Sequence, residues 1–485
     1  VETADKIEPL PDIDFNIRSG NTLVGYVSLE QIKATQKDKL TFDDDLKKIE
    51  QSANNIDGLF QKFRQHQTND QTNFIPHLKQ DLRNNLNKLR AQLDHYLASE
   101  YKIDTEKPEQ FLLWQKSHQP FHWIVEFYGI LHNGGFDVVI GNPPYVEYSN
   151  VKKSYTIKNY ETEKCGNLYA PIIERSIKIV KQKTRIGMII QISAFCTQRM
   201  SAFQNFWFDH SAKSFISFFD DRPGKLFDGL NHIKVAICIN EVGKDLENKI
   251  ATTNFLRFYT EARHVLFQTL FFADLPKNYR SKTHVKRLAN NVEVGIIDKI
   301  NKGQMLEQFV IDNPKNNLLY KNAGNQYFRM CYTKQPIMEK NGNDIKSSTL
   351  HSISFSFDQY IAMAIISSNL FNYWWFVTSD TYHLTKLDIT SFKIFAIDRL
   401  SDSQQIELIE LGRSLEKDYW KNSQIKNTNY QNIGEIKYQE FYAKKSKPII
   451  DTIDQVLSKH YGFTPEELDF IINYDIKYRM GGEEE

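Results

Sequence analysis

The run Asn142-Pro143-Pro144-Tyr145 is the part of the chain whose residue types best fit a chemical role. The side-chain carbonyl of Asn142 can accept a hydrogen bond from an exocyclic –NH2 group. The backbone carbonyl of Pro143 is a second acceptor, and two acceptors on one amine pull it toward tetrahedral geometry, which makes its lone pair available for attack. Tyr145 offers a ring on which an extruded nucleobase can stack, a contact worth about 1–3 kcal/mol. With Pro144 fixing the backbone, the run predicts group transfer to the amine of a planar base.

The residues just before this run must position it. Gly134-Gly135 breaks the chain, and Phe136-Asp137-Val138-Val139-Ile140 follows as a short apolar run. Such a run predicts a strand that is buried on both faces, as in the centre of a parallel sheet. Gly141 permits a sharp exit from the strand. The turn is therefore expected at the carboxyl end of a central strand, where open α/β sheets bind ligands.

Asn-Pro-Pro-Tyr after an apolar strand resembles motif IV of the N6-adenine DNA methyltransferases. Gln119-Pro120-Phe121-His122-Trp123 and Gly135-Phe136-Asp137 resemble the large Eco57I-like and TaqI-like enzymes of type II and type IIG restriction–modification systems. The resemblance implies direct transfer of a methyl group from S-adenosyl-L-methionine to a flipped adenine in double-stranded DNA. Asn142 and Pro143 would orient the amine, and Asn142 would also contact the cofactor. The same four residues also occur as an ordinary turn and in enzymes that methylate RNA or protein glutamine.

Length and composition limit the possible number of domains and the possible classes of protein. With 485 residues the chain has room for two or three domains. Its 61 basic and 60 acidic residues do not indicate a nucleic-acid binder, although they are compatible with a local basic face. No signal peptide and no apolar run of about 18 residues is present, which predicts a cytoplasmic protein without a membrane span. The four cysteines are expected to be reduced thiols, with no metal or disulfide spacing: Cys165, Cys196, Cys238 and Cys331.

The first two segments precede the catalytic turn. Residues 1–30 are expected to end the cofactor-binding half of a methyltransferase domain, with a strand over Ile13, Phe15 and Ile17. By the resemblance, Asn21 would approach the adenine of the cofactor, although a turn-forming asparagine fits equally well. Residues 31–120 are expected to form a helical insertion. Its clearest helix is marked by leucines that step by three and four, namely Leu78, Leu82, Leu86, Leu89, Leu93 and Leu97.

Residues 121–245 are expected to form the catalytic half of the domain. The pattern predicts a helix from about 166–169 with Val180 on its apolar face, and strands over 185–192, 215–219 and 233–239. The loop 223–232 resembles motif VIII of the family. The resemblance implies that Phe227 stacks on the flipped adenine opposite Tyr145, and the alternative is an ordinary core phenylalanine.

Residues 246–485 are expected to form an α+β target-recognition domain that binds DNA. Strands are predicted on either side of Gly324-Asn325, followed by one helix from Phe357 to Trp375. The chain from Asp402 onward is expected to be helical. His383, Thr385 and Lys386 are the candidates for contacts with phosphates or base edges, and each is as well explained by a structural role.

A cofactor-binding Gly-x-Gly turn after a strand is not found in the sequence, and in the family it precedes the Gly-Asn segment. We therefore expect an incomplete fragment: an α/β chain with part of a Rossmann-like methyltransferase domain, whose sheet has an uncovered edge and half a cofactor pocket. A missing N-terminal segment or a partner chain would complete that pocket.

The leading interpretation is a site-specific DNA adenine-N6 methyltransferase. Two alternatives remain open at this point. The first is a DNA-binding specificity module without its own catalysis, and the second is an enzyme that methylates RNA or protein.

Overall fold

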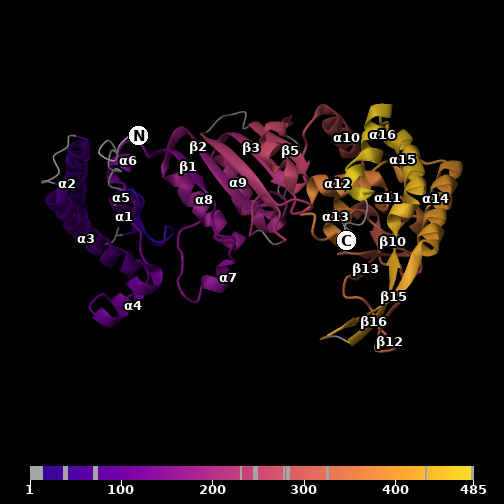
Figure 1. Ribbon diagram of the computed structural model, residues 1–485, viewed down its shortest axis with the longest axis horizontal. Helices are drawn as coiled ribbons and strands as arrows, with labels where there is room; N and C mark the ends of the chain where they lie inside the picture. The colour runs from indigo at the N-terminus through magenta and orange to yellow at the C-terminus, as the bar shows by residue number, and fades with distance from the viewer. Residues whose placement is uncertain are drawn as a thin grey trace, which may run out of the picture. The chain divides into compact units, whose positions relative to one another are not determined.

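The computed structural model describes residues 15–35, 42–68, 75–229, 232–243, 249–276, 279, 284–323, 327–431 and 434–481. The chain is a mixed α/β protein, as predicted, and it divides into two compact units (Figure 1). Among the residues described, every helix is too short or too polar to cross a bilayer. Unit 1 comprises Val1–Gln191, Arg199–Phe215 and Ile237–Lys249, and unit 2 comprises Ile192–Gln198, Ile216–Ala236 and Ile250–Glu485.

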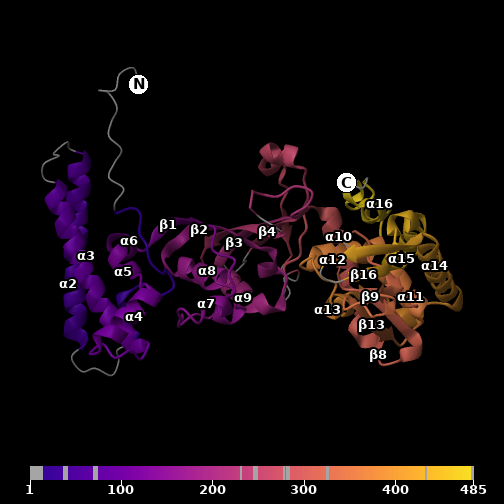
Figure 2. The same ribbon diagram turned by 60° about the horizontal axis from the view of Figure 1, so that its bottom comes forward.

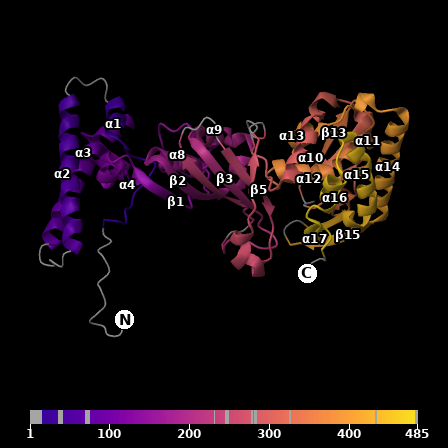
Figure 3. The same cartoon turned by 90° about the horizontal axis from the view of Figure 1, so that it is seen from above.

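Unit 1 begins with a group of helices. The predicted leucine stripe is confirmed, because its six leucines are buried in α3 and share one apolar core with Ile49, Ile56 and Phe63 of α2. The long helices α2 and α3 lie side by side (Figure 3). The helices of this part are α1 (Leu29–Thr35), α2 (Phe42–Thr68), α3 (Ile75–Glu100), α4 (Pro108–His118), α5 (Trp123–Glu126) and α6 (Tyr128–His132).

The strand predicted over Ile13, Phe15 and Ile17 is wrong where it can be judged. Ile13 lies outside the described residues, and residues 15–20 form turns and irregular backbone. The ring of Phe15 packs edge-on against Phe60 and Phe63, each at 5.3 Å between centroids. Packing against helix α2 therefore overrides the local alternation.

Two segments about a hundred residues apart run alongside each other in unit 1. Asn21 forms a bridge with Pro120, and the Phe121 amide donates to the Val24 carbonyl at 2.6 Å. Gly25 has φ +138°, and a Cβ there would lie 2.1 Å from the Phe121 carbonyl oxygen, so only glycine fits this close approach. The segment 119–123 therefore holds the Gly-Asn turn in place.

A six-stranded sheet follows, with the order β1-β2-β4-β3-β5-β6. Helix α8 connects β1 to β2, which pair in parallel, and α8 and α9 lie on the same side of these strands (Figures 2 and 3). The elements of this region are β1 (Phe136–Gly141), α7 (Tyr148–Val151), α8 (Tyr169–Lys178), β2 (Val180–Gln191), α9 (Ser201–Asp209), β3 (Ser211–Phe219), β4 (Val235–Val242), β5 (Lys249–Leu256) and β6 (Ala273–Leu275). The predicted helix and strands are thus confirmed, except that Val180 begins β2 instead of extending α8.

The prediction of a central strand buried on both faces is wrong for β1. In the sheet of the described residues, β1 is an edge strand that pairs only with β2. Val138 is 63% exposed and Ile140 is 86% exposed. These two residues alternate along the strand and so share one face. Apolar residues of this kind are normally buried, but no described residues bury this face of β1. The exposed edge strand agrees with the expected uncovered edge of the sheet.

Unit 2 combines helices with three small sheets. Helix α11 packs against α14 and α15, and α12 packs against α15 and α16 (Figure 2). The helices are α10 (Asn291–Asn301), α11 (Gln359–Ile366), α12 (Asn369–Thr378), α13 (Lys386–Ser391), α14 (Asp402–Lys421), α15 (Lys447–Tyr461), α16 (Pro465–Asn473) and α17 (Ile476–Arg479). The strands are β7 (Gln304–Met305), β8 (Val310–Ile311), β9 (Asn317–Lys321), β10 (Cys331–Tyr332), β11 (Met338–Lys340), β12 (Asn343–Asp344), β13 (Leu350–Phe355), β14 (Lys393–Ile394), β15 (Ser423–Tyr430) and β16 (Gly434–Phe441).

The single helix predicted from Phe357 to Trp375 is wrong, because the chain breaks at Ser367-Ser368 into α11 and α12. The Ser368 hydroxyl accepts from the Phe371 amide at 3.0 Å and caps α12. The buried carboxylate of Asp454 accepts from the amides of Asn369 and Leu370 at 3.1 and 3.0 Å. A cap that comes from 85 residues away cannot be inferred from local periodicity.

The expectation that the chain is helical from Asp402 onward is also wrong. The antiparallel hairpin of β15 and β16 interrupts the helices between α14 and α15. Its side chains are mostly polar on both faces, so the apolar alternation that normally marks a strand is weak here. The predicted turn Gly324-Asn325 and the acidic tail Glu483–Glu485 lie outside the described residues, whereas the flanking strands β9 and β10 are confirmed and pair with each other.

Candidate functional site

The Asn-Pro-Pro-Tyr run leaves the carboxyl end of β1 as predicted. The last strand residue, Gly141, pairs with Met188 of β2, and the chain then turns away from the sheet. Asn142 is exposed, and no described residue makes a hydrogen bond with its side chain. Pro143 is buried and Pro144 is exposed. The turn therefore presents an amide that is available to a ligand, on a backbone that two prolines restrict.

Tyr145 is held in a fixed orientation beside this amide. Its hydroxyl donates to the backbone carbonyl of Ile189 at 3.1 Å, and its ring meets Tyr169 edge-on at 6.4 Å between centroids. Burial, together with the nearby Cys238, raises the pKa of Tyr145 to about 12. The side chain is therefore a neutral, half-buried ring, which suits stacking and not proton transfer.

The chain after the turn is tied to the start of α8. The Leu168 amide donates to the Val146 carbonyl at 2.9 Å, and the Tyr148 amide donates to the Gly166 carbonyl at 2.7 Å. Glu147 also forms an ion pair with Arg199. These contacts fix the path of the chain immediately after Tyr145. The sequence patterns did not single out Glu147 or Arg199, because their pairing spans 52 residues.

Asn21 lies in a tight turn, where its side-chain carbonyl accepts from the Leu23 amide at 3.2 Å. Its backbone amide donates to the Gln119 carbonyl at 2.8 Å. Arg175 of α8 donates to the carbonyls of Leu23 and Gly25 at 3.4 and 3.2 Å and so joins this turn to the helix. The turn-forming role of Asn21 is therefore present, and its amide nitrogen has no partner among the described residues.

Phe227 lies in unit 2, in the loop between β3 and β4, whereas Asn142 and Tyr145 belong to unit 1. The Phe227 side chain is half-buried. The loop is anchored where the Gly224 amide donates to the Phe258 carbonyl at 2.7 Å and Arg263 donates to the Lys225 carbonyl at 2.7 Å. Each unit therefore carries one of the two predicted stacking rings.

A buried charge network in unit 2 supports the same loop. Asp220 follows β3, and Lys234 precedes β4, so the two residues stand at the two ends of the loop. The Asp220 carboxylate contacts Lys234 at 3.5 Å and Arg257 at 2.7 Å. Although burial opposes it, these two cations hold the pKa of Asp220 below its ordinary value. Burial lowers the pKa of Lys234, and Asp220 partly offsets this effect.

The network continues into the loop that carries the predicted DNA contacts. The Lys234 ammonium donates to the Thr381 carbonyl at 3.1 Å and to the Thr381 hydroxyl at 2.8 Å. The Tyr382 hydroxyl accepts from the Lys234 amide at 2.7 Å and donates to the His232 carbonyl at 2.9 Å. The loop that carries Phe227 and the loop 380–385 are thus fastened to each other.

The three residues predicted to contact DNA closely follow Thr381 and Tyr382 in the sequence. Thr385 caps α13 in a capping box, in which its hydroxyl accepts from the Asp388 amide at 3.1 Å and donates to the Asp388 carboxylate. Burial raises the pKa of Asp388 to about 6. His383 and Lys386 are exposed. The structural role of Thr385 is therefore present, and His383 and Lys386 remain accessible to a ligand.

The described residues also form a cavity away from the turn. A cavity of about 450 Å³ in unit 1 lies at the amino end of β1, where Phe136 and Asp137 line it together with Arg18 and Tyr128. The Asn142–Tyr145 turn does not line it. Within the described ranges, no group of three or more His, Cys, Asp or Glu residues is arranged to hold a metal ion.

Residues 27–224 match a family model described as Eco57I restriction-modification methylase. The matched segment contains Asn142–Tyr145 and ends just before Phe227. A protein of Methanocaldococcus jannaschii, "Putative type II restriction enzyme and methyltransferase RM.MjaORFECS2P", is 23% identical over 223 residues. The alignment covers 38% of this chain and 19% of that protein. The chain thus spans about a fifth of the length of this curated relative.

Two solved structures show weaker likenesses. The type IIL restriction-modification enzyme MmeI in complex with DNA is 11% identical, with a TM-score of 0.38, and the match covers 71% of this chain and 57% of that chain. The type IIG restriction endonuclease BpuSI is 11% identical, with a TM-score of 0.25, and the match covers 70% of this chain and 54% of that chain. The family model that matches residues 27–224, a segment that includes the Asn142–Tyr145 turn, is that of the restriction–modification methylases that the motifs resemble.

Proposed function

We propose that this chain is part of a site-specific DNA methyltransferase of a restriction–modification system, which transfers a methyl group from S-adenosyl-L-methionine to the N6 amine of a flipped adenine. The observation that carries the proposal is the exposed amide of Asn142, which has no hydrogen-bond partner among the described residues, in the turn at the carboxyl end of β1 that also holds the anchored ring of Tyr145. Ligands bind at this end of the strands in open α/β sheets. The family of residues 27–224 supports the reaction class.

Each residue of the turn has a defined task in this proposal. The side-chain carbonyl of Asn142 and the backbone carbonyl of Pro143 accept hydrogen bonds from the adenine amine and make its lone pair available. Tyr145 stacks on one face of the base, and Phe227, the second stacking ring implied by the family resemblance, belongs to unit 2. Transfer is direct, because the described turn offers acceptors and a ring but no nucleophilic side chain. The target base must leave the duplex first, since its amine is inaccessible inside the stack.

S-adenosyl-L-methionine would supply the methyl group, and the residues present fit one side of its site. Asn142 has its amide available, and the half-buried Asn21 retains a partnerless amide nitrogen. The edge position of β1 and its exposed Val138 and Ile140 support the proposal that a further strand and its helices pack here. We therefore propose that this chain is the catalytic half of a Rossmann-like domain, and that a preceding segment or a partner chain completes the cofactor pocket.

The incomplete pocket leads to a first prediction. The 485-residue chain alone is expected to bind S-adenosyl-L-methionine only with a Kd above about 1 mM, a free energy weaker than about −4 kcal/mol. Isothermal titration calorimetry measures this directly. Saturable binding in the micromolar range would show that the described residues already form a complete cofactor site.

The stacking role of Tyr145 gives a second prediction. In the full-length protein, Tyr145→Ala is expected to lower kcat/KM for methylation about 10- to 100-fold, because a base–aromatic stack is worth about 1–3 kcal/mol. Tyr145→Phe keeps the ring, loses only the bond to Ile189, and should stay within about 5-fold of the parent, since one hydrogen bond contributes about 1 kcal/mol. Fluorescence of 2-aminopurine at the target position reports whether the base is held outside the stack. Equal activity of the two variants would contradict stacking.

The substrate class is tested by label transfer. Full-length protein and radiolabelled S-adenosyl-L-methionine are incubated in parallel with duplex DNA, structured RNA and denatured protein. Label in DNA alone is expected, and label in RNA or protein would favour the alternative methyltransferases. DNA binding without label in any substrate would favour a specificity module without catalysis, an alternative that the bare edge of β1 keeps open.

We also propose that residues 246–485 act as the target-recognition domain, with DNA contacts from the loop 380–386. The exposed His383 and Lys386 would contact phosphates or base edges. Thr385 would act by capping α13 and so fixing the direction of this loop.

A further inference from the structure

A cavity of about 370 Å³ in unit 2 is lined by several basic side chains, and no described acid lines it. It lies where the end of α10, the segment after β14 and the end of α15 meet. A Cβ atom at Gly303 would lie 2.4 Å from the Ile394 carbonyl oxygen, so glycine lets the chain after α10 approach β14 this closely. The basic residues of the lining are Lys299, Lys302, Arg399 and His460.

Aromatic rings form one wall of this cavity. The ring of Phe395 stacks on His460 at 4.7 Å between centroids and meets Tyr461 edge-on at 5.4 Å. The Tyr461 hydroxyl donates to the Lys393 carbonyl at 2.9 Å and so ties α15 to β14. Burial lowers the pKa of His460, although Glu407 opposes this effect, so the ring is uncharged at neutral pH and offers a hydrogen bond instead of a charge.

Two cations of the lining have no partner among the described residues. Lys302 and Arg399 are exposed, and no described residue forms an ion pair or a hydrogen bond with either side chain. Lys299 differs from them, because it forms an ion pair with Glu467. The cavity therefore carries two positive charges that no described acid compensates.

The negative groups nearest in the chain do not cancel these charges. Asp298 of α10 and Asp398, which adjoins Arg399, are exposed and do not line the cavity. The carboxyl end of a helix carries a negative partial charge, but here Lys393 donates to the Asn301 carbonyl at 3.0 Å and offsets it. The surface of the cavity is therefore positive at neutral pH.

A phosphate group is the ligand that suits this set of side chains. The guanidinium of arginine donates two parallel hydrogen bonds to phosphate oxygens, and lysine adds a compact positive charge. The volume lies near the lower end of the range for ligand pockets, about 300–1,000 Å³, so a phosphate and an attached sugar have room.

The cavity is also close along the chain to the loop 380–386, for which DNA contacts are proposed above. From Lys386, the six residues of α13 rise about 9 Å, and residues 392–396 add at most about 18 Å. Their sum is at most about 27 Å, the length of about eight base pairs at roughly 3.4 Å each. One duplex is therefore long enough to reach both.

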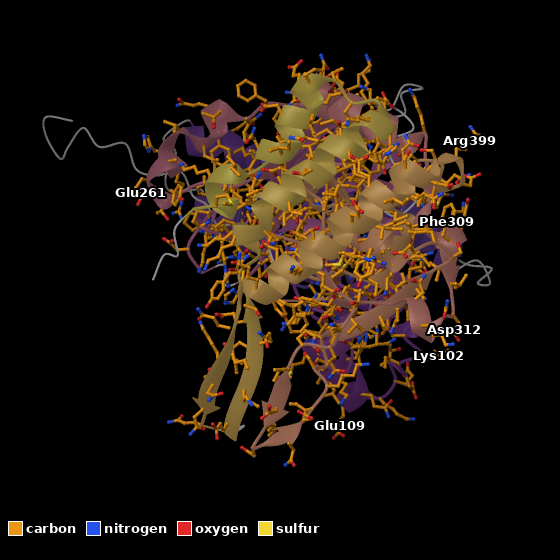
Figure 4. All side chains as sticks on the ribbon, turned by 90° about the vertical axis from the view of Figure 1, so that its right-hand side faces the viewer. Lys102, Glu109, Glu261, Phe309, Asp312 and Arg399 are labelled. Carbon is orange, nitrogen blue, oxygen red and sulfur yellow. The ribbon has the colours of Figure 1, made fainter. Side chains whose placement is uncertain are left out.

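We propose that this cavity is a phosphate-binding site, in which Lys302 and Arg399 bind a backbone phosphate of the substrate DNA. The inference rests on the proposed function for the source of the phosphate. A backbone phosphate carries no base identity, so the cavity positions the duplex and does not select its sequence. Figure 4 shows Arg399 at the outer edge of unit 2, where a large ligand can reach it.

The first test measures how the DNA affinity of the 485-residue chain depends on salt, by fluorescence anisotropy with labelled duplexes. Each neutralised phosphate contributes about −0.9 to the slope of log K against log salt. The double variant Lys302→Gln and Arg399→Gln should make this slope less negative by about 1. Its affinity should fall about 10- to 100-fold, equally for duplexes of different sequence, the usual effect of losing a hydrogen bond to a charged group.

Two further variants separate a specific contact from a loss of charge. Lys315→Gln combined with Lys334→Gln removes two other exposed cations of unit 2 and should leave the slope unchanged. Arg399→Lys keeps the charge but not the paired donors, so it should keep the slope and lower the affinity. A slope in the Lys302 and Arg399 double variant equal to that of the parent would overturn the contact with DNA.

The second test uses inorganic phosphate alone and does not depend on DNA. In ³¹P NMR titrations, the parent chain is expected to bind phosphate, and the Lys302 and Arg399 double variant is not. If the parent binds phosphate but no duplex, the phosphate site stands with a free phosphate compound as its ligand, and the proposed function has failed at its DNA-binding step. If the double variant matches the parent both in salt slope and in phosphate binding, the cavity is not a phosphate site.

Discussion

Replacing Asn142 with alanine in the full-length protein is expected to lower kcat for methylation by about 10²- to 10³-fold, the usual effect of removing one preorganised hydrogen-bonding group from a reaction centre. The exposed side chain makes no hydrogen bond to described residues, so its removal should not disturb the fold. Under the proposed function, the variant loses the acceptor that would draw the adenine amine toward tetrahedral geometry. DNA affinity, measured by gel shift, should change by no more than about 3-fold, since surface substitutions typically alter free energies by about 0.5 kcal/mol.

The matched control for this variant is Asn133→Ala. Asn133 is also exposed and precedes the same strand, but at its amino end, and its amide donates to the Gly129 carbonyl at 2.7 Å. Its removal should leave turnover unchanged apart from a small loss of stability. Undiminished methylation by the Asn142→Ala variant would end the catalytic assignment of the turn.

Replacing Asp220 with alanine should destabilise unit 2 by about 3–5 kcal/mol, because it leaves Lys234 buried without its ion-pair partner and Arg257 with Asp475 as its remaining carboxylate. Domains are typically stable by about 5–15 kcal/mol, so this is a large fraction of the total. The measurement is urea denaturation followed by tryptophan fluorescence. Weakening of this network should also loosen the loops that carry Phe227 and Tyr382, since Lys234 fastens them to each other.

The pKa of Asp220 sets the pH dependence of this effect. Its folded pKa lies below the ordinary value, so the folded state binds fewer protons than the unfolded state in acid. The contribution of Asp220 is therefore fully present above about pH 4, the unfolded value for aspartate, and is lost as the pH falls through the folded pKa. The difference in stability between parent and Asp220→Ala should shrink accordingly below about pH 4.

Asp228→Ala is the control for the Asp220 variant. Its side chain is 99% exposed and lies 3.7 Å from Arg263, so its removal should change stability by no more than about 0.5 kcal/mol. A parent-like denaturation curve for Asp220→Ala would show that the buried charges do not hold unit 2 together.

The parts of the fold that the sequence predicts are those set by neighbours along the chain. The leucine stripe of α3 and the apolar helix α8 follow from residues within a few turns of one another. The break between α11 and α12 escapes such reasoning, because Asp454 supplies a cap from a distant helix. The hairpin of β15 and β16 escapes it as well, since most of its side chains are polar and the apolar alternation is therefore weak.

The burial of β1 was mispredicted for a related reason. The amino-acid composition of a strand indicates whether its side chains are normally buried, and Val138 and Ile140 are apolar residues of this kind. Composition does not indicate which part of a polypeptide packs against them. β1 is exposed because β2 is its only neighbour among the described strands.

In the candidate site too, features formed by adjacent residues could be predicted, whereas contacts between distant residues could not. The position of the turn Asn142–Tyr145 at the end of β1 could be predicted because the strand and the turn are adjacent in the sequence. The pairing of Glu147 with Arg199 and the fastening of Lys234 to Thr381 could not, because they join residues 52 and 147 positions apart. No local pattern records such contacts.

The central claim is that the exposed turn directs a methyl group to the exocyclic amine of adenine. The most direct test is mass spectrometry of nucleosides from duplex DNA that has been incubated with the full-length protein and isotopically labelled S-adenosyl-L-methionine. The account predicts labelled N6-methyl-2′-deoxyadenosine as the product, and its loss in the Asn142→Ala variant. Label in a methylated cytosine, or equal amounts of labelled adenine product from the parent and that variant, would contradict it.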